Sequence, residues 1–343
     1  MAFAFYGLAP KLLDMWDQVP QLRTVSIYWF VAVLLCEVGS YACAWELTRV
    51  ALPSVSWFVA ATSQLTSNAV AKVVPGGAAI GAATGFRMLS VSGIERGSAG
   101  AALTATSIIS NGVLLCLPMV ALFLSILGAP IPDGMIHVAW GGAVLALALF
   151  GFAFSLVRFD RPILWFGKVI TTIVGWINKR LGKTGGPTVE GIVRQRDQMV
   201  SSLGARWRAA LAAAVGNWLL DYFALVCALK ACGVDPRLSL VLLAYAVAAV
   251  LGMVPITPGG VGFVEAGLTA MLVLSGVPGE KALLATLAYR IASYWLPLPA
   301  GLGAHFIFRH RYGKTSGPPD AGSDASGNGS AGPDPRPTPN PAV

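Results

Sequence analysis

The chain is 343 residues long, with 55% hydrophobic and only 12% charged residues. An ordinary soluble domain has about 25% charged residues, and several windows here exceed the roughly 18 apolar residues needed to cross the hydrocarbon core of a membrane. Because that core offers no water to backbone groups, such windows must be helical. The composition therefore excludes a soluble globular protein and predicts an all-α polytopic membrane protein.

The net charge of +8 does not indicate nucleic-acid binding, because the basic residues gather at the ends of apolar windows and in one central loop. This distribution is typical of the positive-inside rule. The five cysteines form no CxxC pair and are interpreted as small buried hydrophobic residues. The three histidines are scattered along the chain. We therefore expect no metal and no cofactor.

Residues 1–24 are expected to form an interfacial segment or a truncated first span. They lack the charged start, long apolar core and cleavage site of a signal peptide. The first clear span is Val25 to about Leu47 and carries Glu37. An acid within a span normally faces the bundle interior or a cavity. Glu37 is thus either functional or hydrogen-bonded to a neighbouring helix.

Ser54–Leu89 is the first of two broken apolar units. A limb rich in Ser, Thr and Asn is followed by Lys72, by Pro-Gly-Gly at 75–77, and by a second limb of about a dozen residues. At about 1.5 Å per residue this second limb is too short to cross, so a re-entrant hairpin is predicted. Two further spans are expected at Ala99–Leu127 and Met135–Val157.

Residues 158–206 form a polar connection in which nine basic residues face three acids. By the Lys/Arg rule this loop is cytoplasmic. Within it, Pro162–Leu181 has an apolar face with two tryptophans and is interpreted as an interfacial helix. A further crossing at this position is the alternative.

The second half repeats the plan of the first. A span at Trp207–Lys230 contains Asn217 and Asp221, a broken unit follows at Leu238–Ser275, and the last span is Lys281–Phe308. These boundaries predict a first membrane repeat at 25–157, a second at 207–312, and a disordered cytoplasmic tail at 313–343.

The two broken units match in sequence. Pro-Gly-Gly recurs at 258–260, and Met-Leu follows at the same distance from each motif, at 88–89 and 271–272. If both units are re-entrant, three spans separate them, and an odd number places the hairpins on opposite faces. The sequence thus predicts six or seven transmembrane helices with two re-entrant hairpins in an inverted repeat. Broken segments in corresponding halves are typical of a binding site at the membrane midplane.

The chemistry of this motif follows from its backbone. Proline is tolerated in the first helical turn and glycine permits close approach, so Pro-Gly-Gly before an apolar limb is expected to present free N–H groups to an anion such as a lipid phosphate. The alternative is that the motif only makes a tight turn for helix packing. The candidate headgroup-binding residues are the two motifs, Pro75, Gly76, Gly77, Pro258, Gly259 and Gly260, together with Arg87, Glu265, Tyr289 and Arg290.

Four charges lie near the two motifs. Glu265 is placed about two helical turns into the limb after Pro258, and Arg290 lies near the middle of the following span. Charges in hydrocarbon require a partner or a wet cavity, so Arg290 is interpreted either as an anchor for an anionic headgroup or as half of a structural ion pair with Glu265. Arg87 and Lys72 flank the first motif, where they either contact a ligand or extend to the headgroups.

The segments VVPGGAAIG, PGGVGFVEAGL and LAYRIASYWLPLPAG resemble the lysylphosphatidylglycerol synthase transmembrane-domain family of flippase-like membrane proteins. The resemblance covers roughly residues 20–312. Its motif positions include Tyr289, Trp295 and Pro297 besides the residues named above, while Ala79 departs from the commoner form of the first motif. In the best-known members this membrane region moves a modified phospholipid between leaflets and a separate soluble domain transfers the aminoacyl group. After Tyr312 only the short tail remains, so aminoacyl transfer is not expected.

The function predicted from these features is translocation of an anionic or aminoacylated phospholipid, or a lipid-linked substrate, across the cytoplasmic membrane. The expected partners are phospholipids and a separate lipid-modifying enzyme, and a homo-oligomer is compatible with the sequence. Two alternatives stay open: a membrane-embedded lipid-modifying transferase, for which no nucleophile or paired soluble carboxylates are seen, and a non-transporting scaffold for a partner enzyme.

Overall fold

The computed structural model describes residues 26–74, 77–128, 206–253 and 257–312, together with single positions between 140 and 204. Nine α-helices lie within this part of the chain. The predicted span at 135–157 and the loop at 158–206 are covered only at single positions, while residues 1–25 and 313–343 lie outside the described residues.

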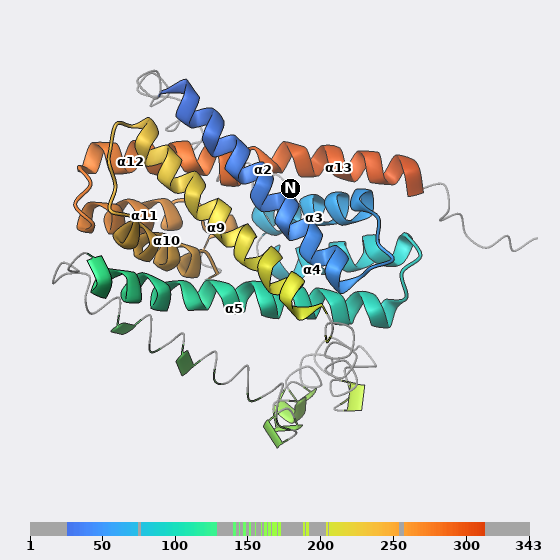
Figure 1. The fold of residues 1–343 in the computed structure, drawn as a ribbon. Coiled ribbons are helices and arrows are strands. Elements are labelled where there is room, and N and C mark those ends of the chain that lie inside the picture. The colour runs from blue at the N-terminus through green and yellow to red at the C-terminus, as the bar shows by residue number, and fades with distance from the viewer. Residues whose placement is uncertain are drawn as a thin grey trace, which may run out of the picture.

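Three helices are long and apolar enough to cross a membrane, as the sequence predicts: α2 (Ile27–Ala51), α5 (Arg96–Gly128) and α9 (Trp207–Ala231). Large apolar side chains are exposed along each of them, for example Leu35, Phe123 and Leu219. A soluble protein would bury such residues, whereas lipid solvates them. Figure 1 shows α2 and α9 side by side, both crossing obliquely over the remaining helices.

Each predicted broken unit is a pair of short helices that pack against one another. The first pair is α3 (Trp57–Val73) and α4 (Gly77–Val91), and the second is α10 (Leu238–Met253) and α11 (Phe263–Leu274). Along α4, glycines at 77, 81 and 85 face α3 so closely that an added Cβ at Gly81 would lie 2.6 Å from the carbonyl oxygen of Ser67. Small residues at every fourth position let two helices approach in this way.

The last predicted span is interrupted rather than continuous. It consists of α12 (Gly279–Arg290), a π-helical turn at Ile291–Trp295, and α13 (Pro297–Tyr312). The amide of Leu296 bonds the carbonyl of Ile291, five residues back, and Pro297 has no N–H for the carbonyl four residues earlier. Hydropathy, which is continuous through this segment, carries no information about such a change of hydrogen-bond register.

Each hairpin packs against a long helical segment of the other half of the chain. Helix α3 of the first hairpin packs against α13, and α10 of the second hairpin packs against α5. In Figure 1, α5 and the α12–α13 segment lie along opposite edges of the molecule, with the α3–α4 and α10–α11 hairpins between them. A large cluster of buried apolar side chains joins α9, α10, α11 and α12. The arrangement surrounds a central space with helices from both halves.

Candidate functional site

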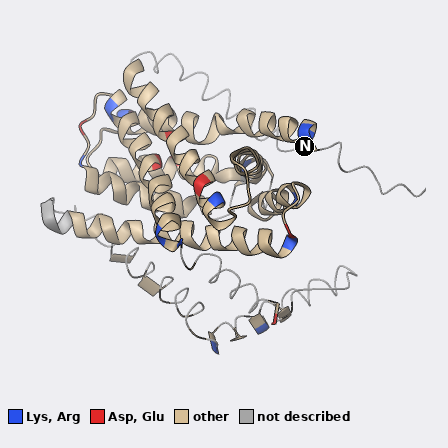
Figure 2. Cartoon of the chain, turned by 45° about the vertical axis from the view of Figure 1, so that its right-hand side comes forward, with Lys and Arg blue, Asp and Glu red and all other residues tan. Residues whose placement is uncertain are grey.

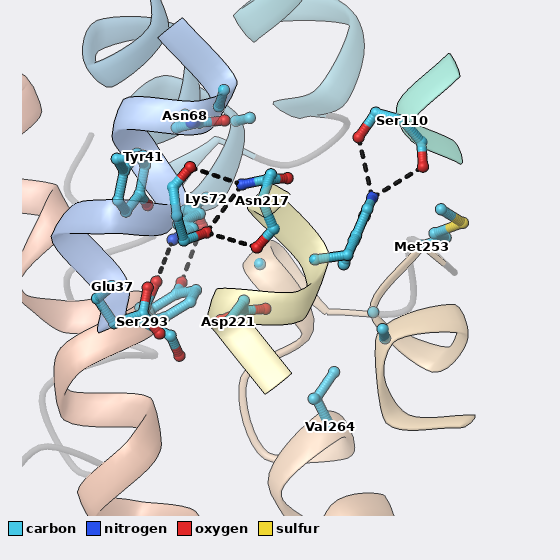
Figure 3. Close-up of a pocket in the computed structure, with 18 of the residues that line it drawn as sticks. Glu37, Tyr41, Asn68, Lys72, Ser110, Asn217, Asp221, Met253, Val264 and Ser293 are labelled. Atoms are coloured by element: carbon cyan, nitrogen blue, oxygen red, sulfur yellow. Dashed lines mark hydrogen bonds between the residues drawn. The ribbon is translucent and has the colours of Figure 1, made fainter. Parts of the chain in front are cut away.

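The central space is a cavity of about 570 Å³ lined by residues of both halves. Most of the long, apolar surface of the helices carries no charge, and charged positions lie mainly at helix ends (Figure 2). The cavity is an exception, because four charged side chains line it: Glu37, Lys72, Asp221 and Arg290. Intramembrane charges of this kind are functional-site candidates. Figure 3 shows how several of the lining residues converge on the cavity from separate helices.

The two acids come from the adjacent helices α2 and α9. Asp221 accepts hydrogen bonds from the hydroxyl of Tyr245 at 2.5 Å and from that of Tyr289 at 3.0 and 3.1 Å. One turn away, Ser40 and Asn217 bond each other reciprocally and fix the register of α2 on α9. Glu37 is buried, and its Oε1 has no hydrogen-bond partner among the described residues. Two tyrosine hydroxyls thus donate to Asp221, whereas one oxygen of Glu37 has no partner among the described residues.

Lys72 links the end of α3 to the π turn of the other half. Its Nζ donates to the carbonyl of Ser293 at 2.7 Å, and its own carbonyl accepts from the hydroxyl of Tyr294 at 3.1 Å. The Ser293 carbonyl is the one that Pro297 cannot bond. The proline of the second half therefore leaves free the acceptor that positions a lysine of the first half.

Arg290 lies at the end of α12 and is held from two sides. Its Nε donates to Glu265 Oε1 at 2.9 Å, its Nη2 donates to the carbonyl of Gly259 at 3.4 Å, and its guanidinium lies 4.5 Å from the ring centre of Tyr294. The side chains of Arg290 and Glu265 are 11% and 15% exposed. The ion pair expected between these two residues is present, and Arg290 still lines the cavity.

The expected position of Glu265 was wrong by about one helical turn. Gly259, Gly260 and Gly262 have φ values of 61°, 71° and 83°, which a right-handed helix cannot contain, so Pro258–Gly260 forms a tight turn and α11 begins only at Phe263. Glu265 therefore lies in the first turn. Its Oε2 accepts the N–H of Gly262 at 2.7 Å, which occupies one of the amides that the sequence suggested were free for an anion.

Gly259 brings the two Pro-Gly-Gly regions together. A Cβ at this position would lie 2.3 Å from the hydroxyl oxygen of Tyr294 and 2.8 Å from the carbonyl oxygen of Lys72. The turn of the second motif thus touches the chain immediately before the first. Both the left-handed backbone and the lack of space require glycine here.

The predicted site residues fall into three groups. Gly259, Tyr289 and Arg290 line the cavity, and Glu265 reaches it through Arg290. Gly260 lies in the adjoining turn and Gly77 is buried against α3. Arg87 is exposed and lines a different pocket beside the turn between α4 and α5, while Pro75 and Gly76 lie outside the described residues.

Sequence reasoning did not single out Asp221 or Tyr245 as site residues. Asp221 lies inside an apolar window as Glu37 does, so the same rule on intramembrane acids would have indicated it. Tyr245 carries no such signal, because a tyrosine in an apolar helix is also a common packing residue. Lys72 was expected either to contact a ligand or to extend to the headgroups, and the structure places it in the cavity wall.

Comparison with known proteins agrees with these features. Two relatives, both described as UPF0104 membrane protein and both from Methanothermobacter thermautotrophicus, are 33% and 32% identical over 90 and 94 residues. These alignments span only about a quarter of this chain and of the relatives' length. The family model described as lysylphosphatidylglycerol synthase TM region matches residues 2–301, and the chain therefore belongs to this family of membrane proteins.

Proposed function

We propose that the protein moves a phospholipid or lipid-linked substrate with an anionic headgroup between the leaflets of the cytoplasmic membrane, and that the central cavity receives the headgroup. The observation that carries this proposal is the presence of Lys72 and Arg290 in one cavity, each contributed by a different half. A phosphate in a low-dielectric cavity is stabilised by such donors. Family membership supports a lipid-related role.

In this proposal the two hairpins are re-entrant and enter from opposite faces, so that the halves form an inverted repeat. Support comes from the matching order of elements and from the exchanged packing of α3 with α13 and α10 with α5. The loop at 158–206 and the C-terminus then face the cytoplasm. A two-part architecture around a fixed midplane site is suited to alternating access.

Within the site, Arg290 acts as the headgroup anchor and Glu265 orients it. Glu265 does not line the cavity, and its two oxygens are occupied by Arg290 and by the amide of Gly262. Tyr289 holds Asp221, and Gly259 lets the turn approach closely. Arg87, which lies beside a separate pocket with Arg96, is proposed to meet headgroups at the membrane surface before they reach the cavity.

The test is leaflet exchange of fluorescently labelled phosphatidylglycerol in proteoliposomes, read by quenching of the label in the outer leaflet. Arg290→Gln removes the proposed anchor and is expected to slow exchange by about tenfold or more, the size of a lost charge-assisted hydrogen bond. Because this change leaves Glu265 buried without its partner, the double variant Arg290→Gln/Glu265→Gln is measured beside it.

Arg49→Gln is the matched control. Arg49 also pairs with an acid, Glu46, at 2.9 Å, but neither residue lines the cavity. Exchange by this variant is expected to equal that of the wild type. Wild-type exchange by both Arg290 variants in a folded protein would overturn the assignment of the anchor. No exchange by the wild-type protein, combined with co-purification of an enzyme, would instead favour a scaffold.

A further inference from the structure

Two carboxyl groups, contributed by the adjacent helices α2 and α9, line the same cavity. Glu37 on α2 is 6% exposed, and Asp221 lies on α9, which packs along α2. Asp221 already accepts hydrogen bonds from two tyrosine hydroxyls, and that of Tyr289 is shared between its two oxygens, which suits a carboxylate. Glu37 Oε1 has no partner in the described part of the chain. The pair therefore contains one acid that two hydroxyls stabilise and one acid with an unpartnered oxygen.

The titratable groups that interact electrostatically with Glu37 come from its own helix and from four others. They are Cys36 and Tyr41 on α2, Lys72 on α3, Asp221 on α9, Tyr245 on α10 and Tyr289 on α12. Lys72 is the one cation among them, and its Nζ is bonded to the Ser293 carbonyl rather than to either acid. The tyrosine hydroxyls of Tyr245 and Tyr289 are directed at Asp221.

Two carboxylates in one membrane-embedded cavity repel one another, because the surroundings screen their charges poorly. Two ionised carboxylates also cannot hydrogen-bond, since neither carries a donor. A single proton on Glu37 removes one charge and supplies an O–H that can be donated to Asp221. This one change satisfies the unpartnered atom and relieves the repulsion.

We propose that Glu37 and Asp221 form a proton-binding site that couples translocation to the movement of protons. Only the coupling to translocation rests on the proposed function, because proton binding by the pair is a property of the protein without lipid. With Glu37 protonated, the negative charges of Asp221 and Glu265 balance the positive charges of Lys72 and Arg290. Deprotonation of Glu37 leaves one excess negative charge.

The charge balance gives the direction of the coupling. A headgroup phosphate brings a further negative charge into the cavity, so its binding is favoured when the pair holds a proton and opposed when the proton has left. By linkage, phosphate binding must in turn favour proton uptake. Release of the proton to the opposite side would then promote release of the headgroup.

The first experiment uses protons alone. Infrared difference spectra of the purified full-length protein, recorded between mildly acidic and alkaline buffers, are expected to show the carbonyl stretch of a protonated carboxylic acid, with the shift expected in D₂O. Glu37→Gln is expected to abolish this band. Glu46→Gln, on the same helix but outside the cavity, is expected to keep it. Absence of the band in the wild type, or its persistence in both Glu37→Gln and Asp221→Asn, overturns the proposal.

The second experiment measures exchange of labelled phosphatidylglycerol in proteoliposomes with an imposed pH gradient, and again with a Na⁺ gradient at equal pH. The wild type is expected to respond to the pH gradient, and Glu37→Gln is expected to lose this response. A response to Na⁺ alone would overturn proton coupling in favour of sodium. If the wild type shows the infrared band but exchanges no lipid under any gradient, the proposed function fails while the proton site stands.

Discussion

Pro297 affects the site because it has no backbone N–H. It provides no N–H to the carbonyl of Ser293, and the Nζ of Lys72 occupies that carbonyl instead at 2.7 Å. The hydroxyl of Tyr294 completes the connection by donating to the Lys72 carbonyl. A residue at the start of α13 thus fixes a cation contributed by α3.

Gly259 offers a test of close contact that is separate from backbone strain. Gly259→Ala places a Cβ against Tyr294 and Lys72, and is expected to destabilise the protein by about 1–2 kcal/mol for its left-handed backbone plus about 1–3 kcal/mol for overpacking. Thermal unfolding in detergent micelles measures the total.

The control for this change is Gly276→Ala. Gly276 also has a positive φ, of 93°, but a Cβ there would meet nothing within 4 Å. It is expected to show only the smaller, conformational loss. Equal losses at the two positions would contradict the role of Gly259 as the contact between the two motif regions.

The hairpin of α3 and α4 depends on small residues along one face. A Cβ at Gly81 would lie 2.6 Å from the Ser67 carbonyl oxygen and 2.8 Å from the Ala71 Cβ. Gly81→Ala is therefore expected to lower stability by about 1–3 kcal/mol and to raise the reactivity of a cysteine placed at Ala71. Gly303→Ala in α13 meets nothing within 4 Å and serves as the control, with no loss of stability expected because alanine is the better helix former. A fully stable Gly81→Ala variant would show that the hairpin is not closely packed.

The helices that the sequence predicts best are those whose signal is local. Continuous apolar windows located α2, α5 and α9 to within a few residues, and the two Pro-Gly-Gly motifs located the breaks between the short helices. The π turn at 291–295 could not be predicted, because apolar residues continue through it. The start of α11 was misplaced because three glycines with positive φ follow Pro258, and sequence alone does not say which glycines adopt that conformation.

The site residues also divide into those with a local signal in the sequence and those without one. Glu37, Lys72 and Arg290 could be selected as charges in or beside apolar windows, and the Glu265–Arg290 pair could be anticipated from the cost of leaving either alone. Their convergence with Asp221 on one cavity depends on the packing of α2 against α9 and α12 against α9. These contacts join residues 177 positions apart for Ser40 and Asn217 and 68 apart for Tyr289 and Asp221, and they leave no local mark in the chain.

At the scale of the whole molecule, the exchanged packing makes each half depend on the other. If the chain is divided within the loop at 158–206, the two fragments are expected to co-purify as a stable, monodisperse complex when they are expressed together. Either fragment alone is expected to aggregate or be degraded, because α3 lacks α13 in one and α10 lacks α5 in the other. Size-exclusion chromatography distinguishes these outcomes, and a stable single fragment would show that the halves are independent domains.

The contact between α3 and α13 also sets an order on biosynthesis. Thr66 Oγ1 donates to the Gly301 carbonyl at 3.4 Å, and the two residues are separated by 235 positions. The first hairpin is made early in translation, yet α13, which packs against α3, is made about 235 residues later. During that interval a polar face of α3 has no partner and is open to membrane quality-control proteases. Damage to α13 should therefore appear first as cleavage near the N-terminal hairpin, far from the altered residues.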